Sequence, residues 1–201
     1  NSYLYGFERT MAEFSAILGR GEEEKWNALA DKRKTLMDEL CLDRETGVYF
    51  DYDFDKGERT GVYSGGSYLP FVFGLSDDTR ALSLVNDRLI GKGGVFCCEK
   101  LPSDGLNYQW GYPNSWAPYN WFGFVANKRL GVAKTAYRIA EFWLNDVAGT
   151  FEKTGKLYEK YDGEKGGAAT VNEYGVPEML GWTAGTFEKM LAEYKRADEV
   201  E

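Results

Sequence analysis

The stretch from residue 109 to residue 118 reads Gln-Trp-Gly-Tyr-Pro-Asn-Ser-Trp-Ala-Pro, a dense group of aromatic, amide and proline side chains. This composition suits a carbohydrate, because indole rings stack on the C–H faces of a pyranose and amides both donate to and accept from its hydroxyls. Pro113 and Pro118 stiffen the stretch and indicate that a loop leads into a helix beginning near Ser115. Trp110 and Trp116 are also compatible with an ordinary aromatic core, so both interpretations stand at this point.

The composition excludes several classes of chemistry. None of the 201 residues is histidine, so the chain alone cannot build a Ser-His-Asp triad, a Cys-His pair or a histidine zinc site. Carboxylates must therefore perform any acid-base step. With 32 acidic and 24 basic residues the net charge is -8, and no basic run carries interleaved aromatics, so no nucleic-acid partner is expected. The sequence has no apolar stretch of the length of about 18 residues that a membrane span needs.

The cysteines and the first residues bear on cofactors and compartment. Cys41, Cys97 and Cys98 match neither zinc-ligand spacing nor a disulfide framework, so we expect reduced structural thiols, no metal and no cofactor. Residues 1–20 contain Glu8 and Glu13 and lack a basic start, which argues against an obvious signal peptide. Reduced thiols favour the cytoplasm over an oxidising compartment.

Hydrophobic periodicity predicts an almost wholly helical, single-domain chain over residues 1–201. The expected helices cover residues 2–18, 22–41, 66–73, 77–91, 115–130, 132–149 and 179–196. The first carries an apolar stripe of Tyr3, Leu4, Phe7, Met11, Phe14, Ile17 and Leu18. Residues 46–63 alternate in polarity and indicate a short hairpin or extended loop. The long connections 93–114 and 155–178 hold most of the chemically useful side chains, which we expect to gather at one end of the helical body.

Several colinear motifs resemble those of the trehalase family, glycoside hydrolase family 37 of the six-hairpin glycosidases. Residues 109–118 resemble its Q-W-D-x-P-N-G-W-A-P signature, with Gly111 in place of the aspartate and Ser115 in place of the usual glycine. Further matches, in the order of the family, are residues 154–162 (T-G-K-L-Y-E-K-Y-D), 173–174 (E-Y), 178–185 (E-M-L-G-W-T-A-G) and 67–70 (S-Y-L-P).

The resemblance implies an (α/α)6 toroid of twelve helices, of which this chain would form about the last seven. Residues 1–201 would then be the C-terminal part of a catalytic domain. Residues 1–5 resemble a family segment that follows the motif with the catalytic acid, so the acid is expected to lie outside this chain. A half-toroid exposes apolar stripes that normally pack on the missing helices, and we therefore expect a second chain or a dimer that completes or covers the half-barrel.

The resemblance also implies an inverting hydrolase, in which one carboxyl group protonates the leaving oxygen and another activates water. Glu159, within the E-K-Y-D motif, would be the general base. The implied substrate-binding residues are Gln109, Trp110, Asn114, Trp116, Glu173 and Trp182. Spacing alone favours a solvated glutamate paired with Lys156 or Lys160, and the position of Glu159 within the E-K-Y-D motif reverses that preference.

The expected substrate is an α-linked glucoside or disaccharide, with trehalose as the leading candidate. Gly111 removes a carboxylate that the family motif supplies, so a related α-glucosidase or a glycosylglycerate hydrolase is the nearest alternative. A noncatalytic carbohydrate-binding or assembly fragment is the alternative from a different class. Glu159 favours the enzyme, whereas the missing acid favours the noncatalytic alternative for the chain by itself.

Overall fold

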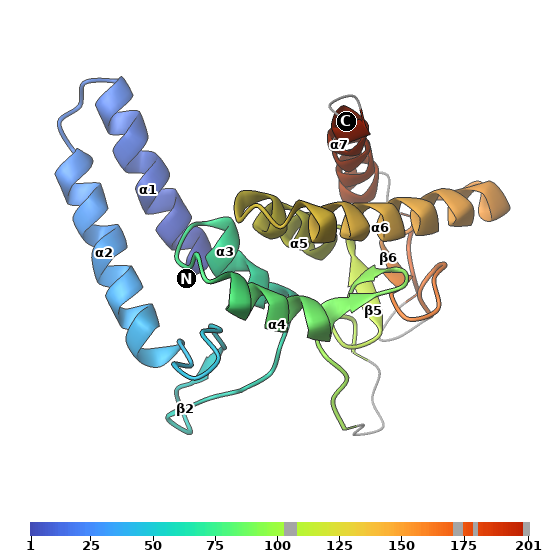
Figure 1. The fold of residues 1–201 in the computed structure, drawn as a ribbon, viewed down its shortest axis with the longest axis horizontal. Helices are drawn as coiled ribbons and strands as arrows, with labels where there is room; N and C mark the ends of the chain where they lie inside the picture. The colour runs from blue at the N-terminus through green and yellow to red at the C-terminus, as the bar shows by residue number, and fades with distance from the viewer. Residues whose placement is uncertain (103–107, 171–174, 179–180, 199–201) are drawn as a thin grey trace.

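The computed structural model describes residues 1–102, 108–170, 175–178 and 181–198. Within these ranges the chain is mostly helical, as predicted (Figure 1). The α-helices are α1 (Ser2–Ile17), α2 (Glu23–Leu40), α3 (Leu69–Val72), α4 (Thr79–Leu89), α5 (Ala117–Arg129), α6 (Ala133–Thr154) and α7 (Gly181–Asp198), and a 3-10 helix, η1 (Gly65–Tyr68), leads into α3. The strands are β1 (Tyr52–Asp53), β2 (Glu58–Arg59), β3 (Ile90–Gly91), β4 (Gly94–Val95), β5 (Asn114–Trp116) and β6 (Lys160–Asp162).

The strands form three antiparallel pairs, β1 with β2, β3 with β4 and β5 with β6. The first pair confirms the hairpin predicted within residues 46–63, although each strand has only two residues. The helix predicted to start at residue 115 begins at Ala117 instead, because Ser115 and Trp116 belong to β5 and Pro118 occupies the first helical turn. The helix predicted to end at residue 149 runs on to Thr154, where Gly155 adopts a positive φ of 71° and ends it.

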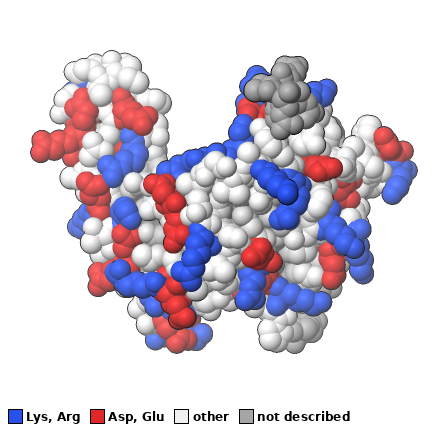
Figure 2. Space-filling model, in the orientation of Figure 1, with Lys and Arg blue, Asp and Glu red and all other residues white. Residues whose placement is uncertain are grey.

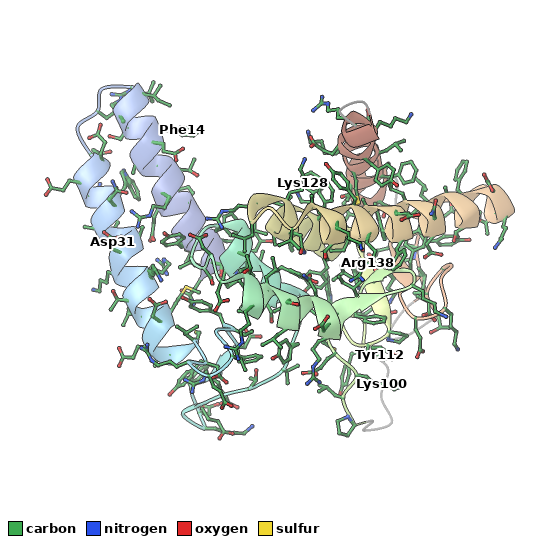
Figure 3. All side chains as sticks on the ribbon, viewed as in Figure 1. Phe14, Asp31, Lys100, Tyr112, Lys128 and Arg138 are labelled. Carbon is green, nitrogen blue, oxygen red and sulfur yellow. The ribbon has the colours of Figure 1, made fainter. Side chains whose placement is uncertain are left out.

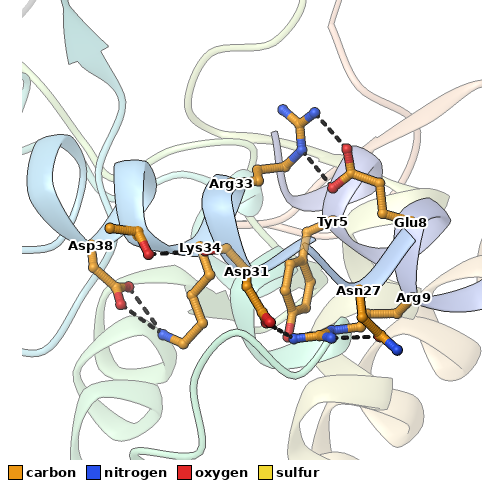
Figure 4. Close-up of polar contacts among 9 residues, drawn as sticks. Tyr5, Glu8, Arg9, Asn27, Asp31, Arg33, Lys34 and Asp38 are labelled. Atoms are coloured by element: carbon orange, nitrogen blue, oxygen red, sulfur yellow. Dashed lines mark hydrogen bonds and ion pairs between the residues drawn. The ribbon is translucent and has the colours of Figure 1, made fainter. Parts of the chain in front are cut away.

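Helices α1 and α2 form a hairpin that projects from one side of the body (Figure 1). Its inner seam mixes polar and apolar side chains: the buried residues of α1 are Ser2, Tyr5, Glu8, Ala12 and Ser15, and those of α2 are Ala30 and Met37. The Arg33 guanidinium donates two hydrogen bonds to the Glu8 carboxylate, at 2.9 and 2.7 Å (Figure 4). Arg9 likewise bridges to Asn27 at 2.7 Å and to Asp31 on α2. Bidentate arginine-carboxylate pairs fix the register of the two helices.

The apolar stripe predicted on the first helix lies on α1 and is largely exposed, although Phe7 packs edge-on against Trp26 of α2 at 6.1 Å. The side chains of Tyr3, Leu4, Phe7, Phe14, Ile17 and Leu18 are each at least half exposed, and Leu29, Leu36 and Leu40 on α2 are also exposed. Phe14 stands near the far end of the hairpin (Figure 3). Near the body, the stripe makes contact through Tyr3, whose ring packs edge-on against Phe73 at 5.3 Å.

The described residues form three apolar clusters, of which the smallest joins the hairpin to the body through Tyr5, Ala30, Met37, Tyr49 and Leu75. The two larger clusters are the cores of the body and meet at α5. One lies among α4, α5, α6 and the loop before η1, and includes Val48, Tyr68, Leu82, Leu89, Val95 and Ile139. The other lies among α5, α6, α7 and β6, and includes Phe124, Trp143, Val147, Tyr161 and Met190. Lys128 on α5 and Glu193 on α7 add an ion pair of 2.7 Å, and the neighbouring lysines lower the pKa of Glu193 to about 2. The second core therefore positions β6 against three helices.

Charged side chains cover the outside without forming a single-sign patch on the face drawn in Figure 2, where acidic and basic groups are mixed. No helix within the described ranges combines the length and apolar character required to cross a bilayer.

The exposed stripe predicts that the isolated chain associates with itself, because an apolar patch of this extent is unfavourable in water. Sedimentation velocity over a concentration series should detect species larger than the monomer. The double variant Phe14→Glu/Leu18→Glu should remain monomeric. The control Ala28→Glu/Thr35→Glu adds the same charge at two exposed positions on the polar side of α2 and should behave as the parent. A parent chain that stays monomeric at every concentration would contradict this prediction.

Candidate active site

The pairing of β5 with β6 brings together the two chemically richest stretches of the sequence. Asn114 pairs with Asp162, Ser115 with Tyr161, and Trp116 with Lys160. All residues of both strands are buried. Because the strands are antiparallel, the loop before β5 meets the turn after β6, where the Gly163 N–H donates to the Pro113 carbonyl oxygen at 2.9 Å, and Glu159 lies at the other end of the ladder, beside the start of α5. This confirms that part of the two long connections gathers at one end of the body.

The loop before β5 is held by side chains that bond to its carbonyl groups. The Asn114 amide donates to the carbonyl oxygens of Tyr108 and Gln109, at 2.9 and 3.1 Å. The Trp116 indole N–H donates to the same Gln109 carbonyl oxygen, at 3.0 Å. On the other side of β5, the Asn120 amide donates to the Trp116 carbonyl oxygen and the Ser115 hydroxyl, both at 2.9 Å. The backbone on either side of Trp110 is therefore fixed.

A stack of indoles occupies this end of the body. The rings of Trp110 and Trp116 lie parallel, with their centroids 3.9 Å apart and an angle of 10° between their planes. Trp182 on α7 packs edge-on against Trp116 at 5.2 Å, and Tyr119 on α5 packs edge-on against Trp110 at 5.6 Å. Trp116 is 2% exposed, whereas Trp110 is 47% exposed. Trp110 therefore presents an apolar surface on a rigid aromatic base, which is an arrangement suited to a sugar ring.

Glu159 immediately precedes β6 and is half-buried. Its backbone N–H donates to the Pro177 carbonyl oxygen at 3.0 Å, and the carbonyl oxygen of the preceding Tyr158 accepts from the Thr183 hydroxyl at 2.8 Å. The residue after Glu159 pairs with Trp116 across the ribbon. The backbone of Glu159 is thus anchored to α7 on one side and to the indole stack on the other.

The two lysines that the sequence offered as partners of Glu159 have other contacts. Lys156 forms an exposed ion pair with Glu178 at 2.6 Å. Lys160 is completely buried, and its ammonium donates to the side-chain oxygen Oε1 of Gln109 and lies 5.7 Å from the Trp116 ring centroid. Sequence reasoning missed this role of Lys160, because lysine is rarely buried and the three buried residues of β6 show no alternation of polarity.

Two carboxylates hold the turn that follows β6. The Asp162 carboxylate accepts from the backbone N–H groups of Glu164 and Lys165, both at 2.9 Å. The Asp146 carboxylate on α6 accepts from the Gly167 N–H at 2.6 Å, and burial raises the pKa of Asp146. Both carboxylates therefore organise the backbone beside the site.

The predicted substrate-binding residues occupy different environments. Trp110 and Trp182 lie in the indole stack, and Gln109 is only 4% exposed. Asn114 and Trp116 are buried and use their polar hydrogens within the loop. Direct sugar contact by these residues stays a prediction. Glu173 lies outside the described residues. Among the residues that the structure describes, no three His, Cys, Asp or Glu side chains form a group that could hold a metal ion.

The sequence model of the trehalase family matches residues 1–195. The chain belongs to the trehalase family. The match covers the hairpin, the body and the indole site of this trehalase-family chain.

Solved structures with the same fold include the neutral trehalase Nth1 from Saccharomyces cerevisiae, with a TM-score of 0.82 and 24% identity; the alignment covers 98% of this chain and 38% of the yeast chain. The GH63 mannosylglycerate hydrolase from Thermus thermophilus in complex with glucose has a TM-score of 0.73 and 21% identity, covering 94% of this chain and 44% of that one. At these identities the similarity shows the fold. This trehalase-family chain spans less than half the length of either protein.

The two stacked indoles predict unequal costs of truncation. Trp116→Ala should lower the free energy of unfolding by about 3 to 5 kcal/mol, because it removes a buried aromatic side chain. Trp110→Ala should cost no more than about 1 kcal/mol, as for a half-exposed side chain whose removal leaves no sealed cavity. Urea unfolding of both variants beside the parent measures this difference. Equal losses would show that Trp110 is a core residue.

Proposed function

We propose that this chain supplies the general base and the sugar platform of a trehalase-like inverting glycoside hydrolase. The observation that carries the proposal is the β5–β6 pairing, which places the residue after Glu159 opposite Trp116, whose ring stacks on the half-exposed Trp110. Membership of the trehalase family supports the reaction class.

The proposed reaction is a single displacement at the anomeric carbon. Trp110 stacks on one face of the sugar, and the Glu159 carboxylate removes a proton from a water molecule as its oxygen attacks. The glycosidic C–O bond breaks, and the leaving oxygen takes a proton from a second carboxyl group on the opposite side. The two carboxyl groups must lie roughly 6.5 to 9.5 Å apart so that the water fits between the base and the sugar. We place the second carboxyl group on a polypeptide segment outside this chain.

Trehalose is the substrate we favour, and the glycine at position 111 leaves room for a second candidate. Gly111 stands where the trehalase signature has aspartate, and a Cβ added there would lie 3.2 Å from the Cβ of Tyr108. The loop is thus closely packed around a glycine, and we expect its contacts with substrate to differ from those that the signature aspartate would make. A glycosylglycerate is the second candidate, since a mannosylglycerate hydrolase shares the fold. A noncatalytic carbohydrate-binding or assembly fragment is the candidate that requires no acid.

We also propose that the exposed stripe of α1 is covered by further helices of the same type of domain. The fold of this chain accounts for 38% of the yeast trehalase chain, so most of that protein lies beyond the shared part. The α1–α2 seam is already filled by ion pairs and a small apolar cluster, and Phe7, Phe14 and Ile17 remain at least half exposed. Helices with their own apolar stripes are the partner that such a surface fits.

Activity assays test the assignment of the base. The chain alone should release no glucose from trehalose above background, because we place the acid on a segment outside it. In a complete enzyme, Glu159→Gln should lower kcat by about 100 to 10,000-fold, the usual contribution of a general base, while sugar binding persists. The control Glu152→Gln changes an exposed glutamate on α6 and should retain full activity. Near-normal turnover by Glu159→Gln would overturn the assignment.

A further inference from the structure

Lys160 is a fully buried lysine at the start of β6, next to the candidate base. An ammonium group is retained in such a place only when it is hydrogen-bonded or paired. Lys160 donates to Oε1 of Gln109 and lies over the Trp116 ring at 5.7 Å. Because lysine has donors and no acceptor, it selects the oxygen end of the Gln109 amide. The contact therefore has one permitted orientation.

Gln109 is held at two points, and the second point is its backbone. Its carbonyl oxygen accepts from the Trp116 indole at 3.0 Å and from the Asn114 amide at 3.1 Å. Its side-chain nitrogen Nε2 is buried and has no hydrogen-bond partner within the described chain. Of the described contacts of this side chain, the bond from Lys160 is thus the one that determines where the amide lies.

The next residue after Gln109 is Trp110, the proposed sugar platform. We infer that Lys160 is a positioning residue, whose buried ammonium ties the strand that follows Glu159 to the loop that carries Trp110. This inference rests on the proposed function for its consequence, which is a constant separation between the base and the sugar platform. The tie itself is a property of the fold and is measurable without substrate.

Lys160 fixes the position of the loop before β5 more than it adds to the free energy of unfolding. Its burial removes an ion from water, and replacing a buried ion by an apolar side chain of similar volume is often neutral or stabilising. The ribbon that it crosses has only three residue pairs, and two-stranded ribbons of this size are marginal by themselves. A tie between side chains at the end of this ribbon therefore limits the movement of the loop before β5.

The test uses the Trp116 indole N–H, whose bond to the Gln109 carbonyl oxygen reports the position of the loop. Nitrogen-15 spectra of the chain resolve the indole N–H groups of its 6 tryptophans, and Trp116→Phe assigns the resonance. In the parent, this N–H should exchange slowly with solvent deuterium. In Lys160→Met, exchange of this N–H should be at least about tenfold faster, because the loop before β5 is no longer held by the ammonium. The urea midpoint should stay close to that of the parent, because the methionine side chain still fills the buried position.

Two variants of Gln109 provide the matched controls. Gln109→Glu keeps an oxygen for the ammonium and should retain slow exchange, whereas Gln109→Leu removes the acceptor and should behave as Lys160→Met. The double variant Lys160→Met/Gln109→Leu should exchange no faster than either single variant, because both remove the same contact. If Lys160→Met does not fold, Gln109→Leu and Gln109→Glu make the same comparison. Unchanged protection in both Lys160→Met and Gln109→Leu, or equal loss in Gln109→Glu and Gln109→Leu, would overturn the inference.

A trehalose titration of a complete enzyme separates this inference from the proposed function. If both hold, Lys160→Met should raise KM about tenfold, with a smaller change in kcat, because the platform and not the base is displaced. If exchange is faster in Lys160→Met but the parent enzyme does not bind trehalose, the proposed function is contradicted and the positioning role of Lys160 stands. If the parent enzyme binds trehalose and exchange is unchanged in Lys160→Met, only the positioning role of Lys160 is contradicted.

Discussion

The three-residue ladder between β5 and β6 is the constraint on which the site depends. It joins two connections that are far apart in the sequence, and it sets Lys160 opposite Trp116. The indole stack, the loop before β5 and the anchoring of Glu159 to α7 all meet at this ladder. Helices α5, α6 and α7 pack around the buried Tyr161 of β6 and hold the ladder in place. The helical body is therefore a support for one short ribbon.

The α1–α2 hairpin departs from a typical amphipathic pair. Its seam combines the Glu8–Arg33 pair with a small apolar cluster that includes Tyr5 and Met37, while most of its large apolar side chains are exposed. Hydrophobic periodicity predicted both helices and their approximate ends, because the spacing of apolar residues depends on the helix alone. It could not predict which face this chain buries. That choice depends on the neighbours of the hairpin, and most of the stripe stays exposed even though Phe7 contacts Trp26 of α2.

The site was predictable in part. The composition of residues 109–118 indicated a carbohydrate, and the motifs of the chain indicated the trehalase family, which the family match confirms. The β5–β6 ladder itself was not predicted, because strands of three buried residues leave no alternation to detect. Lys160 was considered only as a surface partner of Glu159, since lysine is rarely buried. Its contact with Gln109 depends on a pairing between distant segments, which local sequence patterns do not contain.

The central claim is that Glu159 and Trp110 serve one sugar site because β5 and β6 pair. A crystal structure of a complete enzyme with a non-hydrolysable trehalose analogue tests this most directly. We expect a glucose ring stacked on Trp110, with a water molecule between its anomeric carbon and the Glu159 carboxylate. An analogue bound away from Trp110, or a Glu159 carboxylate with no line of approach to the anomeric carbon, would contradict the claim.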